Sequence, residues 1–189
     1  MKYKNEKDKR LLKEWQMETK NLPVKIFIPI GKKQEYLDKL IPFDETFALK
    51  PSELGAEDWI TLFNLSMTSL EGVLIQRTIE KLKSAAGIFT IEDIQYEIER
   101  EPKSGKETKE IASSLFSAAD SWGVFSKTSA GTEISDLTIP GTTTVLDISV
   151  YSSIAAFNVR ALVISLVSRK LFEKRMDERK REEIESLRH

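Results

Sequence analysis

The sequence contains no cysteine and a single histidine, and these two absences remove several classes of chemistry. Without cysteine the chain cannot form disulfides, use a catalytic thiol, or bind zinc or an iron–sulfur cluster through thiolates. The single histidine is His189, the last residue of the sequence. We therefore expect no Ser-His-Asp triad, no histidine acid–base pair and no histidine-rich metal site. The lack of cysteine is also typical of a cytoplasmic protein.

Long hydrophobic runs and an excess of one charge are also missing. The longest apolar run, residues 161–167, is interrupted by Ser165 and is far shorter than a membrane span. We therefore expect no transmembrane helix, no signal peptide and no membrane partner. Lys and Arg total 29 and Asp and Glu total 30, which gives a formal net charge of -1. The total charge therefore favours neither nucleic acid nor a membrane surface as a partner.

The most definite pattern lies near the end of the sequence, in residues 141–189. Residues 142–148 are β-branched and almost wholly apolar, which predicts a strand covered on both faces, as in a parallel sheet. A long helix should follow from near Ser153 and stay buried through about Phe172. Its charged part, from Arg169 onward, should project into solvent or toward a partner. We expect the residues that face inward to be Ile154, Phe157, Ala161, Ile164 and Leu171, with Leu162, Val163 and Leu166 on the other flank.

The beginning of the sequence predicts one helix and one strand. Residues 2–20 carry Trp15 and other apolar residues among alternating charges, a pattern typical of an amphipathic helix. This helix either docks Trp15 on the body of the protein or serves as a basic arm that contacts DNA. Residues 24–31 predict a second strand, at a sheet edge because Pro29 has no N–H to donate. Residues 42–50 should form an extended connector.

The middle of the sequence predicts a helical lobe. Capping signals precede two of its helices, at Thr68-x-x-Glu71 and at Thr90-x-x-Asp93. After the last helix, residues 123–140 favour a hairpin or wing with a polar tip at residues 126–132. The expected helices cover residues 55–64, 68–83, a short stretch between Thr90 and Pro102, and residues 106–122, the last of which should direct Ile111, Leu115, Phe116, Ala119 and Trp122 inward.

Together these elements predict an α-rich α/β fold with few, parallel strands. The expected organisation has three parts. Residues 1–50 hold the first helix, a core strand and the connector. Residues 51–125 form the helical lobe. Residues 126–189 hold the hairpin, a core strand and the long C-terminal helix.

Asp147 is the carboxylate whose position suggests nucleotide chemistry. Apolar residues lead into it, as in a Walker B strand whose aspartate holds a magnesium-bound water. However, Ile148 follows, where a hydrolytic P-loop enzyme usually places Glu. The stretch at Gly31 also lacks the first glycine and the hydroxyl residue of a phosphate loop. We therefore interpret Asp147 as a structural residue near the next helix, and we assign no catalytic, cofactor-binding or metal-binding residue.

Two cations are candidates for contact with another subunit or with DNA. Arg160 lies in the first turns of a mostly apolar helix, where a cation needs a partner. Asp147 or Glu133 could supply that partner, or Arg160 could act in trans at a subunit boundary. Lys127 lies with Gly131 in the polar tip. This tip is either a mobile pore or DNA loop, or an ordinary exposed turn.

Several segments, taken in order, resemble the interior of an archaeal HerA-type ATPase, a relative of FtsK and of conjugative DNA pumps. The most specific segment is PGTTTVLDIS with the helix that follows it. The resemblance covers most of the chain. It is carried by KIFIPIG (25–31), LKPSELGAEDWITLF (49–63), FTIEDI (89–94), ADSWGVF (119–125) and IPGTTTVLDIS (139–149), followed by VRALVISLVSRKLFEKR.

This resemblance implies a partial RecA-like core with a helical insertion between the phosphate loop and the Walker B strand. Members of the family form hexameric rings that move double-stranded DNA, often with a nuclease partner, and they use ATP and magnesium. The chain matches only the intervening region. The phosphate loop is expected before Met1 and the true Walker B strand after His189. We therefore expect a fragment or truncated relative that lacks the nucleotide site.

Two other classes of function fit parts of the sequence. Three helices followed by the expected hairpin have the order of a winged-helix DNA-binding or adaptor module. The third helix of this set, however, offers only Lys106 and Lys109 near its start as cations for DNA. The charged C-terminal helix would also suit a protein-interaction scaffold.

Overall fold

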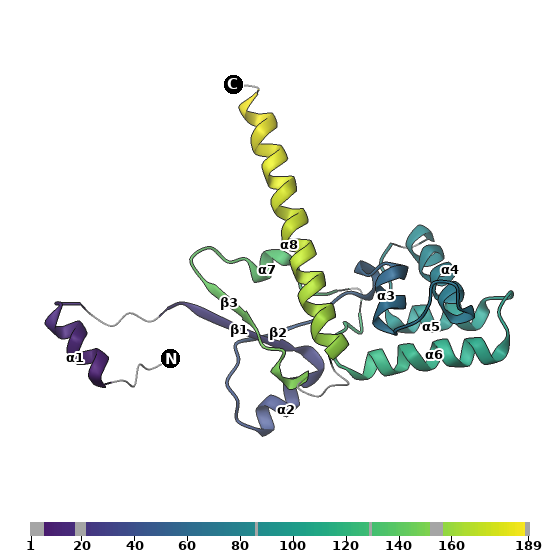
Figure 1. The fold of residues 1–189 in the computed structure, drawn as a ribbon, viewed down its shortest axis with the longest axis horizontal. Helices are drawn as coiled ribbons and strands as arrows, with labels where there is room; N and C mark the ends of the chain where they lie inside the picture. Colours follow the sequence, from purple (N-terminus) through teal and green to yellow (C-terminus); the bar gives the residue numbers. More distant parts are fainter. Residues whose placement is uncertain (1–5, 18–21, 86, 129, 152–156, 188–189) are drawn as a thin grey trace.

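The structure is a computed structural model that describes residues 6–17, 22–85, 87–128, 130–151 and 157–187. It is rich in helix and contains one small parallel sheet, so the predicted α-rich α/β class is confirmed. Figure 1 shows the sheet in the centre, with helices α3 to α6 on one side of the long helix α8 and helix α1 on the other.

The sheet has three strands in the order β2-β1-β3, all parallel. β1 (Val24–Pro29) is therefore the central strand, and its predicted place at an edge was wrong. β3 pairs with β1 from Val24 to Phe27, and β2 pairs from Phe27 to Pro29. Pro29 ends the strand, beyond the pairing with β3, where a missing N–H costs little. The other strands are β2 (Glu45–Phe47), inside the expected connector, and β3 (Thr143–Leu146).

The predicted burial of β3 on both faces was also wrong. β3 is an edge strand, and residues along it alternate between exposed and half-buried. Val145 retains 40% of its side-chain exposure. The apolar run was read as evidence of burial, but β-branched residues also suit an edge strand with one covered face.

Helices α3 to α6 form a compact group that we call the lobe. Asp93 and Thr90 make the predicted capping box at the start of α5, where the Asp93 N–H donates to Thr90 Oγ1 at 3.3 Å and Asp93 Oδ2 accepts from the Thr90 N–H at 2.8 Å. At α4 the helix starts later than predicted, because Ser69 rather than Thr68 accepts the Gly72 N–H. The elements are η2 (Pro51–Glu53), α3 (Ala56–Leu62), α4 (Leu70–Ala85), α5 (Ile91–Arg100) and α6 (Lys106–Ser121).

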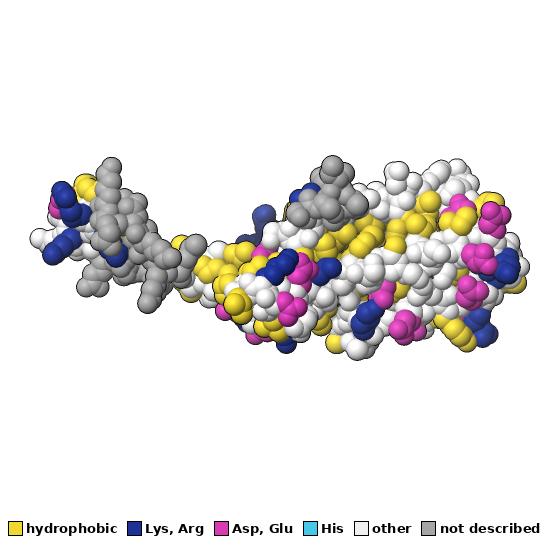
Figure 2. All heavy atoms as spheres, turned by 90° about the horizontal axis from the view of Figure 1, so that it is seen from below, with side chains coloured by type: hydrophobic (Ala, Val, Ile, Leu, Met, Phe, Trp, Pro, Cys, Tyr) yellow, Lys and Arg dark blue, Asp and Glu magenta, His cyan; other side chains and the backbone are white. Residues whose placement is uncertain are grey.

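An aromatic cluster forms the centre of the lobe. The Trp59 ring lies 4.9 Å from the Phe116 ring and 5.2 Å from the Phe125 ring, between centroids. Phe116 and Ala119 face inward as predicted, but Ile111 is 43% exposed and was wrongly assigned to the core. Figure 2 views the molecule from below and shows a band of hydrophobic side chains across the face beneath the lobe. The lobe therefore encloses an aromatic core of its own and also carries hydrophobic side chains on part of its surface.

Residues 123–140 do not form the predicted hairpin where the structure describes them. They contain one short helix, α7 (Ile134–Leu137), and a single parallel bridge between Phe125 and Leu49. The expected polar tip lies against the chain that leaves β2. The Thr132 N–H donates to Ala48 O at 2.9 Å, and Thr132 Oγ1 accepts from the Ala48 N–H at 2.9 Å. Backbone groups after β2 therefore bond to this segment, and its described residues do not form the wing that the winged-helix alternative requires.

Helix α8 (Phe157–Ser186) follows a short turn, η3 (Ser149–Tyr151). The inward face of α8 was predicted wrongly. Val159, Val163 and Leu166 are buried, whereas Ala161, Ile164 and Leu171 lie on the opposite, exposed side. The expected start near Ser153, and Ile154, lie outside the described residues. Phe172, at the expected end of the buried part, is 67% exposed. Lys174 still contacts Thr138 beside α7, and the end of the helix then extends away from the rest of the molecule (Figure 1), as predicted for its charged part.

Two glycines join the sheet to the end of the lobe. The Gly31 N–H donates to Gly123 O at 2.8 Å, and Gly123 has a φ of +71°. A Cβ on Gly31 would lie 2.5 Å from Gly123 Cα, so the two backbones can touch only because both residues lack a side chain. The buried Tyr151 hydroxyl donates to Trp122 O at 2.9 Å beside this contact. Gly31 lies in η1 (Ile30–Lys32), which leads into α2 (Lys33–Asp38).

Helix α1 (Glu6–Glu14) is set apart from the sheet and the lobe in Figure 1. Trp15, just after α1, is 75% exposed and Leu11 is 45% exposed. The expectation that this helix docks Trp15 on the body of its own chain was therefore wrong. In the described parts of the chain, no helix is both long and apolar enough to cross a membrane.

Candidate functional site

Asp147 lies directly after β3, at the carboxyl edge of the parallel sheet, where ligands bind in many open α/β folds. Its Oδ1 accepts the Ser149 N–H at 3.0 Å, and Tyr36 from α2 donates to the same carboxylate. Burial raises the pKa of Asp147, but the hydrogen bonds from Ser149 and Tyr36 outweigh it and hold the pKa below the ordinary value. These contacts occupy the carboxylate with neighbouring residues of its own chain.

The same edge of the sheet does not fit a nucleotide phosphate. A phosphate loop needs backbone N–H groups that point into an open cradle. Here the Gly31 N–H is already bonded to Gly123 O, and the backbone of Gly123 occupies the space beside Gly31. In the part of the chain that the structure describes, no group of three or more His, Cys, Asp or Glu side chains could hold a metal ion. We therefore derive no step through ATP or magnesium for these residues.

The two candidate cations lie on different parts of the molecule. Lys127 forms an ion pair with Asp120 near the end of α6. Arg160 is half-buried in the first turn of α8 and lines a shallow apolar hollow with Ile164. Glu133, one of the suggested partners of Arg160, accepts instead from Lys50. The hydrogen bond from Lys50 lowers the pKa of Glu133.

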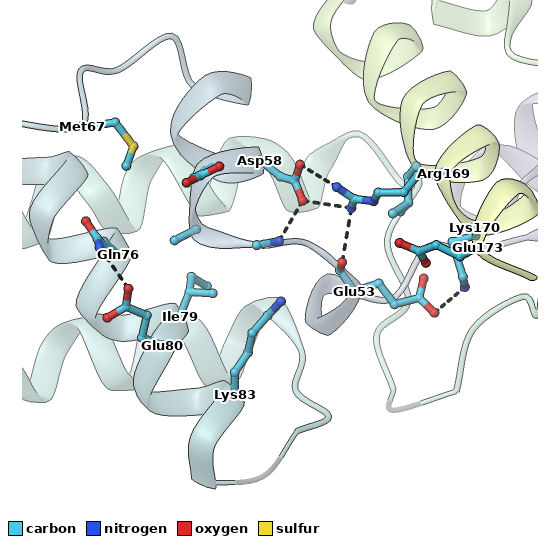
Figure 3. Close-up of a pocket in the computed structure, with 14 residues that line it drawn as sticks. Glu53, Asp58, Met67, Gln76, Ile79, Glu80, Lys83, Arg169, Lys170 and Glu173 are labelled. Atoms are coloured by element: carbon cyan, nitrogen blue, oxygen red, sulfur yellow. Dashed lines mark hydrogen bonds and ion pairs between the residues drawn. The ribbon is translucent and has the colours of Figure 1, made fainter. Parts of the chain in front are cut away.

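A groove between α3, α4 and α8 has a volume of about 580 Å³. This volume lies within the range of about 300–1,000 Å³ that is usual for ligand pockets. Figure 3 shows its two walls, with Arg169 reaching from α8 toward Asp58 on α3 and Lys83 pointing in from α4. We call this feature the α3–α8 groove.

A bidentate ion pair between Arg169 and Asp58 closes one side of the groove. Arg169 Nη1 and Nη2 donate to the two carboxylate oxygens of Asp58 at 3.1 and 3.0 Å. Next to it, Lys170 donates to Glu53 Oε1 at 2.5 Å. Burial raises the pKa of Asp58, but the hydrogen bonds from Arg169 and from the Gly55 N–H outweigh it and lower the pKa below its ordinary value. These pairs fasten the middle of α8 to the lobe.

The groove combines an apolar floor with an acidic rim. Ile79 and Leu166 are buried in its floor, and Met67 is 43% exposed at its edge. Two of the three cations that line it, Arg169 and Lys170, are already held by carboxylates. The acidic residues that line it are Glu53, Glu57, Asp58, Glu80 and Glu173, against Lys83, Arg169 and Lys170.

Sequence reasoning missed the groove because it treated the charged part of α8 as solvated from Arg169 onward. The first two charged residues of that part, Arg169 and Lys170, in fact bond to α3 and η2. A signal was available: Asp58 and Glu53 lie in a segment otherwise full of buried residues, where carboxylates need partners. The position of α8 over that segment was not available from the sequence.

Comparison of this chain with models of protein families, with curated proteins and with solved structures finds no match.

Proposed function

We propose that this chain is part of a DNA-translocating ATPase of the HerA and FtsK type, and that it supplies strands of the sheet and a helical lobe. The supporting observation is the path of the chain. It leaves the sheet after β2, builds α3 to α6, and returns as β3 on the other side of β1. The lobe is therefore an insertion between two strands of a parallel sheet, which is the arrangement that the sequence resemblance implies.

Uncovered apolar surfaces add further support. Val145 on the edge strand β3 and Ile164 and Phe172 on the outer side of α8 are 40%, 59% and 67% exposed. Exposed apolar residues of this kind are available for contact with another part of an assembly. In the proposed motor, further strands beside β3 and further elements over α8 would make that contact.

The proposal assigns a supporting role to this chain. ATP and magnesium would be held by other parts of the motor, because the edge of the sheet at Gly31 and Asp147 does not fit them. The partners would be double-stranded DNA, a nuclease and further copies in a hexameric ring, in the cytoplasm. Arg160 and Lys127 are the residues we propose for contact with a neighbouring subunit or with DNA.

DNA binding by the purified chain tests this proposal. A single copy with net charge -1 lacks the summed phosphate contacts of a ring. We expect a Kd weaker than about 1 µM at physiological salt, with affinity that falls steeply as salt rises. Fluorescence anisotropy with a labelled duplex measures both. Lys127→Ala should lower the affinity and the salt slope, compared with Lys103→Ala as the control.

Two results would overturn the proposal. One is tight, sequence-selective binding that survives physiological salt, which favours a dedicated DNA-binding module. The other is no binding even at low salt. A saturable, magnesium-dependent ATPase rate that Asp147→Ala abolishes would return the nucleotide site to this chain.

A further inference from the structure

The outer side of α8 carries an apolar stripe that is open to solvent. Ile164 is 59% exposed and Phe172 is 67% exposed. These residues lie eight positions apart, about two turns of helix, with the exposed Ser168 midway between them, so all three share one side. Unlike the buried Val163 and Leu166 on the inner side, this stripe offers surface that a partner can cover.

The two ends of the stripe differ in shape. At its start an apolar hollow of about 530 Å³ is lined by Arg160, Ala161, Ile164 and Ser165, and we call it the α8 hollow. Ala161 and Ser165 have small side chains and are exposed, so the hollow is open from outside. At the other end of the stripe the large Phe172 side chain stands out from the helix. One face of α8 therefore has both a depression and a projection.

We propose that two copies of this chain pair through the outer sides of their α8 helices, which run antiparallel, with Phe172 of each copy in the α8 hollow of the other. Pairing centred beside Ser168 places Phe172 opposite Ser165 of the other copy. It places Met176, which is 38% exposed, opposite Ala161. Because both copies use the same surface, the contact is two-fold symmetric and closes at a dimer.

The antiparallel direction follows first from shape. In a parallel pair each residue would face its own counterpart, so the two Phe172 rings would meet and hold the helices apart. The two α8 hollows would then face each other and stay unfilled, which forfeits packing contacts. In the antiparallel pair each projection fills a depression, and the exposed Ser168 near the centre lets the two helices approach closely.

Charge favours the same direction. Arg179 lies seven residues after Phe172 on the same side, and a parallel pair would set it against its own counterpart, cation against cation. The antiparallel pair brings Arg179 to Asn158 of the other copy, next to the exposed Glu57 on α3, which lines a second hollow with Asn158. Arg179 pairs with Glu183 of its own helix at 4.0 Å, and this exposed pair holds the guanidinium weakly.

The inference names a second copy of the chain as the cover for the outer side of α8, and it does not rest on the proposed function. The last part of α8 stands clear of the sheet and the lobe (Figure 1), so a second helix can approach it there. DNA binding tests the proposed function and self-association tests this contact. Failure of one is therefore distinguishable from failure of the other.

The first experiment measures self-association of the full chain by sedimentation velocity over a series of concentrations. We expect Phe172→Ala to raise the concentration of half-association at least about tenfold, because the ring at the centre of the contact is lost. Ile184→Ala is the matched control and should change nothing, since Ile184 is 54% exposed on the same helix but lies nearly opposite Ile164 around its axis. A wild-type chain that stays monomeric, or equal effects of the two variants, would overturn the proposal.

The second experiment exchanges the projection and the depression. Ser165→Phe alone should weaken association at least about tenfold, because two rings then compete for one space. The variant with both Ser165→Phe and Phe172→Ser restores one ring at each place, so most of the lost affinity should return. Both positions are exposed, so these changes leave the core of the chain intact. If the double variant associates as weakly as Phe172→Ala, the two positions do not meet.

The third experiment decides the direction of the helices. Because the chain has no cysteine, Ala161→Cys and Met176→Cys each introduce a unique thiol on the outer side of α8. Mild oxidation of a mixture of the two variants should give a mixed disulfide dimer on a non-reducing gel. Neither variant alone should link to itself, because its two thiols lie about 22 Å apart along antiparallel helices. Self-linking of each variant would show parallel helices, and absence of any cross-link would also refute the proposal.

Discussion

The lobe and the sheet differ in how completely each one is covered. Trp59, Ile75, Ile94 and Phe116 in the lobe are fully buried. The sheet, in contrast, leaves its edge strand β3 half-exposed along its length. The lobe therefore contains its own hydrophobic core, whereas the sheet is incompletely covered by the described chain. This difference predicts that equivalent truncations will have unequal effects in the two regions.

The largest effect should come from the aromatic cluster of the lobe. Phe116→Ala removes a fully buried ring that lies 4.9 Å from Trp59 and 5.1 Å from Phe63, between centroids. We expect a loss of about 3–5 kcal/mol in the free energy of unfolding, measured by chemical denaturation. Val145→Ala in β3 is the comparison and should cost less than about 1 kcal/mol. Equal losses would mean that the sheet is as well covered as the lobe.

A smaller loss is expected where the two regions meet. Gly31→Ala places a methyl group 2.5 Å from Gly123 Cα, so the sheet and the end of α6 must move apart. We expect a cost of about 1–3 kcal/mol, as for other overpacked sites. Gly105→Ala is the control, because nothing lies within 4 Å of the added Cβ. Thermal unfolding of both variants should show the difference, and a stable Gly31→Ala variant would contradict the close backbone contact.

Two neighbouring residues of α8 give a test within a single helix. Val163 is 1% exposed on the inner side, and Ile164 is 59% exposed on the outer side. Val163→Ala should cost about 1–3 kcal/mol, because it removes two buried methyl groups and leaves a cavity. Ile164→Ala should cost less than about 0.5 kcal/mol as a surface change. If urea denaturation gave the reverse order, the helix would be rotated from the position described.

The smallest expected effect concerns the ion pair between Arg169 and Asp58, which is partly exposed. Arg169→Ala should cost about 0.2–1 kcal/mol at neutral pH, and Arg179→Ala, farther along α8, even less. Because the pKa of Asp58 is lowered in the folded protein, the contribution of the pair is present above the ordinary value of 3.8 and is lost as the pH falls below it. Urea denaturation in an acid series should show this loss in the wild type and not in Asp58→Asn.

The sequence predicted the lobe better than the sheet, for a physical reason. Helix limits depend on local signals, such as the capping box of Thr90 and Asp93, and these are readable residue by residue. The order of the strands depends on pairing between residues far apart, such as Val24 with Thr143, and no local signal encodes it. The edge position of β3 and the central position of β1 were therefore both missed.

The inner face of α8 was missed for a related reason. The helix is apolar on several sides over residues 159–167, so periodicity could not choose between Val163 and Ile164. Its rotation is fixed by contacts with the lobe, including the pair of Arg169 with Asp58 and the hydrogen bond from Asn158 Nδ2 to Leu62 O at 3.1 Å. The α3–α8 groove depends on that rotation, so the candidate site could not be predicted either.

The bridge between Leu49 and Phe125 has a consequence for how the chain folds. These residues lie at the two ends of the segment that forms the lobe, and the bridge brings them together. Pairing β1 with β3 before the lobe has folded would require closing a long flexible loop, at a cost in entropy that grows with its length. Once the lobe is folded, the remaining loop is short. The helices of the lobe should therefore form first, and the pairing of β3 with β1 should come last. The rate of refolding should then be set by the folding of the lobe.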